Sequence, residues 1–523
     1  MQGITRWLPI LILVIAVLAR LLPGTRTIDD SFITYRYARN ILGGEGFVYN
    51  PGERVLGTTT PLYALLLVIV GFFAGGTQAD FPVIALIINA LADAFTALLL
   101  LKIGKYLGYK IAGAAAALVW AIAPYSVTFA IGGLETSLYV LLLTAAVYTQ
   151  LEKRHKLSAL IASLSLLTRP DALLLLGPLA LTRIFFSDGH ISIQKSINLF
   201  KELIVFLIPT TAWFSFAAFY FGSPIPHSIL AKSLAYRQPE TAALIRLLQH
   251  YGTPFLGHLS FGIPWIGIGF VVYLFLFTVG ARAALKGSPR LWAWVIYPWI
   301  YIAAFAIANP LIFRWYLTPP LPAYIFFILV GGESIVRTFT KSKDNHASPR
   351  SWRVPMKKLL LALVILFPII LTLRGWTLEP DHGPNRPAPE MAWFKLELLY
   401  RQAAKILSNE IGDDGDSPLP VLAAGDVGVL GFYTPTRILD TVGLNSPQST
   451  DYYPLDESFY AINYAVHPDL IHDQQPDYVI LLEAYGRQGL FKDPRFKAGY
   501  SLLHKLPTDI YGSDGMLIFR RNQ

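Results

Sequence analysis

Long apolar stretches recur along the first 373 residues and are separated by short polar segments. A helix needs about 20 predominantly apolar residues to cross the ~30 Å hydrocarbon core of a bilayer. The pattern therefore predicts a polytopic α-helical membrane protein with about eleven transmembrane helices. The candidate spans are 4–22, 82–101, 111–128, 136–151, 157–168, 171–186, 202–221, 259–281, 291–308, 317–336 and 359–374.

A twelfth apolar stretch, residues 61–76, decides the orientation of the later spans. Its 16 residues would cover only about 24 Å as a helix, so we expect it to lie in or dip into the outer face. The loops assigned to the cytoplasm then carry 20 Lys and Arg, and the outer segments carry ten, Arg20 among them. The positive-inside rule favours this arrangement. It predicts a multi-pass plasma-membrane protein with a cytoplasmic N-terminus and an extracytoplasmic segment after about residue 374.

The last 148 residues have a different pattern. They are polar and contain short β-type runs together with a helical stretch at 389–411. This mixture predicts a soluble α/β domain. We therefore expect a transmembrane domain at 1–375 and an extracytoplasmic α/β domain at 376–523. The β-type runs are 420–433, 437–444, 476–485 and 515–521.

Composition agrees with a membrane protein and narrows the chemistry. Hydrophobic residues make up 54% of the chain and charged residues only 15%. The net charge of +9 follows from the positive-inside bias, so no nucleic-acid partner is expected. Because the chain has no cysteine, disulfides, thiol nucleophiles and Cys-ligated zinc are excluded.

Two adjacent carboxylates, Asp29 and Asp30, follow the first apolar stretch in the segment TIDDSFITYRYARN. Apolar residues at helical spacing after them predict an amphipathic helix at the membrane interface. Asp30 is placed to cap that helix. A carboxylate at a water–lipid boundary is also suited to act as a general base toward an acceptor hydroxyl. Helix capping would explain the presence of one of these two acids but not of the other.

Three cationic or titratable residues lie on the predicted outer face. Arg314, in FRWYLTPPLP, either snorkels at a helix end or binds phosphate through its planar fork. Lys232 is either an ordinary exposed lysine or a contact for an anionic head group. His227 by itself gives little indication of a metal site.

Two further acidic residues, Glu135 and Asp171, are predicted on this face beside Arg169. Arg169 and Asp171 lie in TRPDALLLL, where a local ion pair that holds the turn is favoured over direct catalysis. Glu135 either caps the helix that starts at Thr136 or lines the site. Residues 425–431, GDVGVLG, follow a predicted strand, but they lack the full phosphate-binding fingerprint and its following helix.

The segment DDSFITYRYARNILGGEGFVYNPGERVLGTTTPLYALLL resembles the first outer loop of the GT-C superfamily of lipid-phosphate-sugar glycosyltransferases. It is most similar to bacterial terminal arabinofuranosyltransferases, and more distantly to protein O-mannosyltransferases and the aminoarabinose transferases of lipid A. The later motifs follow in the order that this family would have them. These motifs are GGLETSLY, LLTRPDALLLL, YFGSPIPHSILAKS, RWYLTPPLP and GDVGVLGFYTPTRILDTVGLNS.

The resemblance implies a GT-C fold with juxtamembrane helices in the first outer loop. It implies inverting transfer of a sugar from a polyprenyl-phosphate donor to a hydroxyl of a cell-envelope glycan, lipid or protein. Asp29 would be the base. Relatives have Glu where this chain has Asp30, which leaves the division of labour between the two acids open. Arg314 and Lys232 would bind the donor phosphate, and the residues lining the site would be Glu135, Arg169, Asp171, His227 and Tyr316.

No metal or other cofactor is required by this chemistry, because a lipid phosphate needs charge neutralisation more than a strong acid. Some relatives use a divalent cation, and Asp29, Asp30 and Glu135 are the acids that would hold one. The alternative function is a transporter or flippase of a lipid-linked glycan. Transporters place charges near the bilayer midplane and often contain inverted repeats. Here the charges concentrate toward one face and no repeat is evident, which favours the transferase.

Overall fold

The computed structural model describes residues 2–186, 192–340, 353–380, 383–412 and 418–522. The chain forms two compact units, each assembled from three segments. The first consists of 1–25, 85–211 and 241–392, and the second of 26–84, 212–240 and 393–523. The second unit thus combines the first polar loop with the C-terminal region. The division predicted after residue 375 remains a prediction, and part of the predicted loop 337–358, residues 341–352, lies outside the described residues.

The first unit is helical. Apart from its helices it contains the two-residue strands β1 (Trp376–Thr377) and β2 (Ala388–Pro389), which pair antiparallel. Its α-helices are α1 (Gln2–Leu21), α4 (Phe81–Tyr106), α5 (Lys110–Ile122), α6 (Pro124–Ile131), α7 (Thr136–Leu151), α8 (His155–Thr168), α9 (Leu173–Phe185), the start of α10 (Ile193–Phe221), α12 (Ala242–Gly252), α13 (His258–Phe261), α14 (Trp265–Gly287), α15 (Trp292–Ala308), α16 (Leu321–Thr340) and α17 (Arg353–Leu373).

Every predicted span coincides with a helix, or at 111–128 with the pair α5 and α6. That pair is bent by 42° at its break. By length and composition, six of the described helices can cross a membrane, or seven if the bent pair counts as one. The helices α7 and α8 are shorter, with 16 and 14 residues. The count of eleven crossings therefore remains a prediction.

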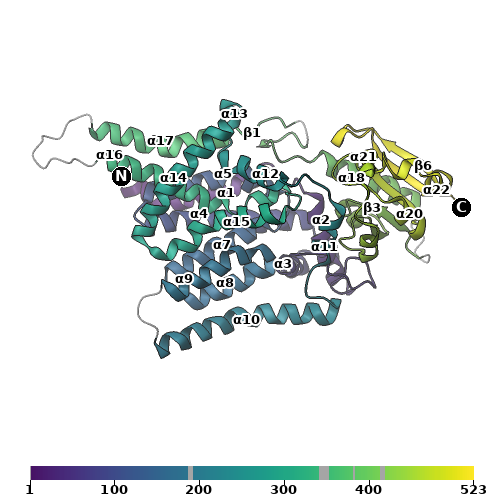
Figure 1. Ribbon diagram of the computed structural model, residues 1–523, viewed down its shortest axis with the longest axis horizontal. Helices are drawn as coiled ribbons and strands as arrows, with labels where there is room; N and C mark the ends of the chain where they lie inside the picture. Colours follow the sequence, from purple (N-terminus) through teal and green to yellow (C-terminus); the bar gives the residue numbers. More distant parts are fainter. Residues whose placement is uncertain (1, 187–191, 341–352, 381–382, 413–417, 523) are drawn as a thin grey trace, which may run out of the picture. The chain divides into compact units, whose positions relative to one another are not determined.

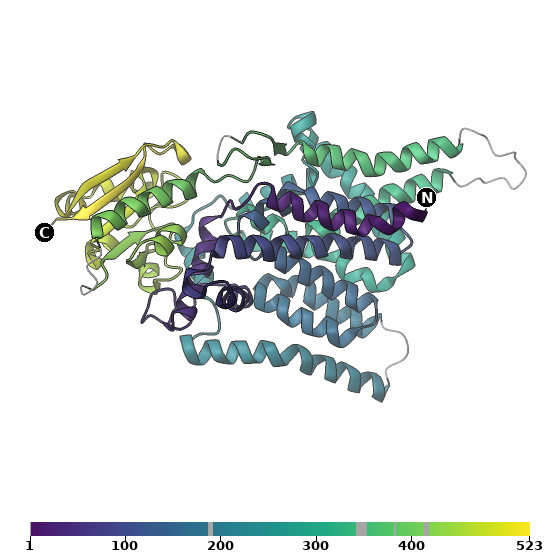
Figure 2. The ribbon, with the colours of Figure 1, turned by 180° about the vertical axis from the view of Figure 1, so that it is seen from behind.

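The helices α14 and α16 pack closely along their length, and Figures 1 and 2 show them running side by side. Glycines make this approach possible. A Cβ at Gly280 would overlap the carbonyl of Phe327, and one at Gly331 would overlap the carbonyl of Leu276. Small residues at such crossings let helix backbones come together where lipid offers no hydrophobic driving force.

The second unit contains a five-stranded mixed sheet with helices around it, visible in green and yellow in Figure 1. The strand order is β4-β3-β5-β7-β6, with β3 parallel to β4 and β5 and with β7 antiparallel to β5 and β6. The predicted α/β character of the C-terminal region is confirmed. The strands are β3 (Val421–Ala424), β4 (Arg437–Asp440), β5 (Tyr478–Leu482), β6 (Tyr500–Leu506) and β7 (Met516–Arg521), and the helices are α2 (Asp29–Leu42), α3 (Pro61–Phe73), α11 (His227–Ala235), α18 (Lys395–Ile411), α19 (Gly428–Tyr433), α20 (Pro468–Gln474), α21 (Glu483–Gly486) and α22 (Pro494–Gly499).

The short apolar helix α3 covers most of residues 61–76, the stretch whose crossing of the membrane was in question. It has 13 residues, about 20 Å at 1.5 Å per residue, which is shorter than the hydrocarbon core. It packs against α2 inside the second unit.

Helix α2 is bound to the C-terminal region by its two arginines. The Arg36 guanidinium donates hydrogen bonds to the carbonyls of Gly431 (2.5 Å) and Thr436 (3.1 Å). Arg39 donates to the carbonyl of Phe432 at 2.8 Å and lies over its ring. Charge-assisted bonds of this kind are about twice as strong as neutral ones, so the first loop and the C-terminal region are joined by specific contacts.

A buried ion pair joins helices of the first unit. Arg20 and Asp93 are both fully buried, and the Arg20 Nε lies 3.1 Å from the Asp93 carboxylate. Arg20 also donates to Ser126 at 2.7 Å, and Asp93 accepts from Ser137 at 2.8 Å. Arg20, counted above among the outer loop cations, is thus an interior residue of α1.

We expect Asp93→Ala to lower the free energy of unfolding by about 3–5 kcal/mol, because it leaves the Arg20 guanidinium buried without its partner. Thermal unfolding of the purified chain in detergent measures this. The control is the double variant Arg20→Met/Asp93→Ala, which removes both charges and should recover much of the loss. Equal stability of the single variant and the parent would contradict the role assigned to this pair.

Candidate functional site

Both predicted acids lie in the first turn of α2, which starts at Asp29. The residue before the helix is Ile28, and no side chain caps this end. The expectation that Asp30 caps α2 is therefore wrong. Acidic residues in a first turn still interact favourably with the positive end of the helix dipole.

Asp29 caps a different helix. Its carboxylate accepts hydrogen bonds from the backbone N–H of Gly428 (2.8 Å) and of Val429 (2.7 Å), at the start of α19. Asp29 is only 7% exposed. The segment GDVGVLG contains the start of helix α19, contrary to the sequence-based expectation, and two amide groups at that start bind a carboxylate of the same chain.

A cluster of buried polar groups surrounds Asp29. The Glu397 carboxylate of α18 accepts a hydrogen bond from the backbone N–H of Asp29 at 3.3 Å. Asp426, which lies between β3 and α19, accepts hydrogen bonds from the hydroxyls of Tyr400 and Tyr485. Three regions of sequence that carry no shared motif thus converge on one acidic cluster.

Burial sets the titration of these acids. It raises the pKa of Asp29 well above its usual range, and the neighbouring charge of Asp426 adds to this effect. Burial likewise raises the pKa of Asp426 to about 6 and that of Glu397 to about 8. These shifts follow from the high cost of an ionised carboxylate in a low-dielectric environment.

Asp30 is the accessible member of the pair. Its side chain is 34% exposed and lies 3.4 Å from the Lys232 ammonium of α11. His227 starts this helix, and its backbone N–H donates to the carbonyl of Leu56 at 2.8 Å. Burial lowers the pKa of the His227 ring. The structure therefore places Lys232 beside an acid in the second unit, while its predicted phosphate contact remains a prediction.

Four of the predicted lining residues meet in the first unit. The Arg169 guanidinium binds Asp171 at 2.9 Å and lies 3.5 Å from Glu135. It also stacks on the Tyr316 ring, 4.8 Å from the ring centroid. The local Arg169–Asp171 pair matches the structural interpretation of TRPDALLLL. Glu135 precedes α7 but makes no capping hydrogen bond to it, so the capping expectation for Glu135 is wrong.

Arg314 lines a cavity of about 460 Å³ in the first unit. Arg246 of α12 lines the same cavity, and burial together with the charge of Arg314 lowers the pKa of Arg246. Neither arginine forms a salt bridge with any residue that the structure describes. His250, also in the wall, bonds to the carbonyl of Leu317 at 2.9 Å, and burial lowers its pKa to about 3.

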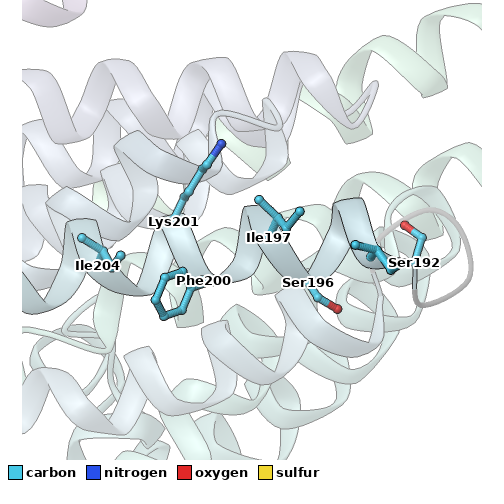
Figure 3. A pocket seen from close by; sticks show the side chains of 7 residues that line it. Ser192, Ser196, Ile197, Phe200, Lys201 and Ile204 are labelled. Atoms are coloured by element: carbon cyan, nitrogen blue, oxygen red, sulfur yellow. The ribbon is translucent and has the colours of Figure 1, made fainter.

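A second hollow, of about 690 Å³, runs along α10 and is shown in Figure 3. Its side chains all come from α10 and the residue just before it, among them Ile197, Phe200 and Ile204. Ser192, Ser196 and Lys201 also line it. A hollow along a single helix nevertheless lacks the enclosing walls of a ligand pocket.

Comparison with solved structures identifies the architecture. The ArnT structure from Cupriavidus metallidurans in the apo state matches 99% of this chain and 98% of its own length, with a TM-score of 0.58 and 12% identity. The structure of ArnT bound to undecaprenyl phosphate matches 99% of this chain and 98% of its own length, with a TM-score of 0.55 and 13% identity. An oligosaccharyltransferase from Archaeoglobus fulgidus matches 97% of this chain and 72% of its own length, with a TM-score of 0.55 and 14% identity.

The chain has the GT-C fold. With its apolar helices, this chain is a multi-pass membrane protein. The expected fold class, a GT-C-like helical membrane region with a C-terminal α/β domain, is confirmed.

Sequence comparison adds two findings. It is 28% identical over 232 residues to the terminal β-(1→2)-arabinofuranosyltransferase of Mycobacterium tuberculosis, covering 40% of this chain and 35% of that protein. The chain thus spans about a third of the length of the curated relative it matches. Residues 394–519 match a domain of unknown function, DUF8728. That match includes Glu397, Tyr400 and Asp426.

If the protein binds a divalent cation, the acids expected to hold it are Asp29, Asp30 and Glu135. Within the described ranges, no group of three or more His, Asp or Glu residues is arranged to hold a metal ion. The oligosaccharyltransferase from Archaeoglobus fulgidus was solved in complex with Zn and sulfate.

Sequence reasoning missed three residues of these clusters. Glu397 and Asp426 belong to the C-terminal region, where no catalytic motif pointed to them. Asp426 stood inside GDVGVLG, and an acid within a glycine turn was the one available signal. Arg246 was counted only as an outer cation, although an arginine on the apolar helix face of ALIRLL is itself unusual.

We expect Gly428→Ala to destabilise the second unit by about 1–3 kcal/mol, because its Cβ would overlap the Asp29 carbonyl oxygen and force the backbone apart. Thermal unfolding measures the change. Gly499→Ala is the matched control, since a Cβ there meets nothing within 4 Å. A Gly428 variant as stable as the control would contradict the tight contact between α2 and α19.

The raised pKa of Glu397 predicts that stability falls with rising pH. The unfolded chain releases this proton near pH 4.5 and the folded chain near pH 8, so the free energy of unfolding decreases across that window. Glu397→Gln should flatten the upper part of the decrease, and exposed Glu45→Gln should leave it unchanged. Melting temperatures measured from about pH 5 to pH 8 test this, and parallel curves for parent and Glu397→Gln would disprove it.

Proposed function

We propose that this chain is an inverting glycosyltransferase that moves a sugar from a polyprenyl-phosphate donor to a hydroxyl of a cell-envelope glycan, lipid or protein. The GT-C fold and the similarity to an arabinofuranosyltransferase support this proposal. The observation that carries it is the acid pair at the start of α2, in which one carboxylate is fixed and the next is accessible.

In this proposal Asp30 is the base. A general base must reach the proton that it removes, and Asp30 is partly exposed whereas both oxygens of Asp29 accept backbone hydrogen bonds. The Lys232 ammonium lies 3.4 Å from the Asp30 carboxylate and supplies a positive charge beside it. Asp29 acts as a positioning residue, because it anchors the first turn of α2 to α19. This assignment differs from the family-based expectation that Asp29 is the base.

The reaction balances with these groups. The acceptor oxygen forms a bond to the anomeric carbon while its proton passes to Asp30. The bond between that carbon and the phosphate oxygen breaks, and its electron pair remains on the phosphate. Arg314 binds the phosphate and neutralises the charge that develops there. The Arg169 cluster with Glu135, Asp171 and Tyr316 serves as a rigid part of the site, and His227 positions α11.

The charge bias of the loops supports an orientation with the N-terminus in the cytoplasm and the acid pair on the extracytoplasmic face of the plasma membrane. The acceptors there are components of the cell envelope. The undecaprenyl phosphate bound by ArnT supports a prenyl-linked donor. No resident cofactor takes part in the proposed steps.

The test is transfer by the purified full-length chain from polyprenyl-phosphate arabinose and related donors. Asp30→Asn should reduce transfer roughly 10²- to 10⁴-fold, since it removes the base, and should leave the melting temperature unchanged. Asp29→Asn should reduce transfer and should also lower the melting temperature, because the side-chain amide cannot accept both N–H hydrogen bonds. Exposed Asp509→Asn is the control.

Near-normal transfer by Asp30→Asn, together with loss of transfer by a normally stable Asp29→Asn, would move the base to Asp29. If the parent chain transfers no sugar from any prenyl-phosphate donor while a lipid-linked glycan crosses the membrane in its presence, the transferase proposal falls in favour of a flippase.

A further inference from the structure

The cavity that holds Arg246 and Arg314 carries an excess of positive charge. Two guanidinium groups line about 460 Å³, and burial together with the charge of Arg314 lowers the pKa of Arg246. Glu390 lines the same cavity, but among the described residues no salt bridge joins it to either arginine. Like charges in a partly buried cavity cost free energy unless an anion neutralises them, so this cavity is suited to an anion.

The two histidines of the wall do not share that charge near neutral pH. Burial lowers the pKa of His250 to about 3 and lowers that of His258 as well. The cationic groups of the cavity are therefore the two arginines. Arginine offers a planar fork that matches phosphate oxygens, and two such forks suit an anion that carries about two negative charges.

Apolar side chains form much of the remaining wall, beside the polar Gln249 and Thr253. The apolar residues include Leu256, Leu259, Ile266 and Leu317. An inorganic anion would leave this surface without a partner. A phosphate carrying a hydrocarbon chain would cover it and remove that apolar surface from water, which is favourable.

We propose that this cavity binds a phosphate monoester with an apolar chain and that Arg246 is a second catalytic cation, matched to the leaving phosphate more than to the donor. This inference rests on the proposed function. The donor is a phosphodiester with one negative charge. When the bond from the anomeric carbon to the phosphate oxygen breaks, the electron pair stays on the phosphate, which becomes a monoester with a charge of about −1.5 to −2 near pH 7.

The second arginine therefore interacts most strongly with the charge that appears during the reaction. Only interactions that are stronger in the transition state than in the ground state accelerate the chemical step. Arg314 alone meets the charge of the donor, and Arg246 adds the neutralisation needed by the leaving group. The same preference makes the lipid phosphate product a strong inhibitor of its own formation.

Binding to the purified full-length chain in detergent tests this directly. The probes are farnesyl phosphate, its methyl ester as a diester of equal length, and inorganic phosphate. The parent should bind the monoester on the order of tenfold or more tighter than the diester, and inorganic phosphate more weakly than either. Arg246→Gln should remove most of the preference for the monoester, on the order of 10- to 100-fold for a lost charge-assisted contact.

Arg314→Gln should weaken the binding of both esters, and Arg282→Gln, on the exposed surface of α14, is the matched control. In transfer assays Arg246→Gln should lower kcat more than it raises the donor KM and should relieve inhibition by farnesyl phosphate. Where the glutamine variant is unstable, Arg246→Lys is measured, and it should keep part of the monoester preference because it keeps the charge.

A parent-like monoester preference in a stable Arg246→Gln variant overturns the inference, as does complete loss of that preference in Arg246→Lys. Inorganic phosphate bound as tightly as farnesyl phosphate would show a free-phosphate site instead of a lipid site. If the binding pattern holds but no donor supports transfer, the proposed function fails and the cavity assignment stands. If transfer occurs without the pattern, the inference about Arg246 fails alone.

Discussion

The second unit depends on the carboxylate of Asp29 and the two amide groups that it holds at the start of α19. A buried carboxylate is costly unless hydrogen bonds satisfy it, and unpaired amides at a helix start are costly in the same way. Each group satisfies the other. The bonds of Arg36 and Arg39 to the carbonyls of residues 431–436 secure the same contact. The first polar loop and the C-terminal domain are for this reason one structural body.

This contact also separates the two adjacent acids. The residue that fixes the helix cannot readily serve as a base, because its oxygens are already occupied. Asp30, the next residue of the same helix, is thereby held in a defined position and remains accessible to solvent. Burial and the charges of neighbouring acids raise the pKa of Asp29 and of Asp426, and Lys232 supplies a positive charge beside Asp30. An accessible acid is thereby held near a counterion, while the protonation of its buried neighbours depends on pH.

Local pattern in the sequence was sufficient for much of the fold. Apolar runs marked each long helix, and alternating β-type runs marked β3, β4, β5 and β7. The site was harder, because its contacts join residues that lie far apart along the chain. Arg20 was counted as an outer cation, and its partner Asp93 lies 73 residues further along the chain. Nothing in the spacing around Asp29 indicates a partner at residue 428, and Arg246 looked like one more loop cation. Residue type suggested what these groups can do, and only the tertiary fold showed which of them meet.

The contact between Asp29 and Gly428 links positions 399 residues apart. Domains generally fold as units while the chain is being synthesised, N-terminal parts first. This unit cannot follow that order. Its first segment, residues 26–84, leaves the ribosome before the later helices of the first unit exist, and its last segment follows those helices in the chain. The amphipathic α2 therefore remains without its partner while the intervening residues are synthesised, and the acid pair takes its final position only after residue 428 has been made.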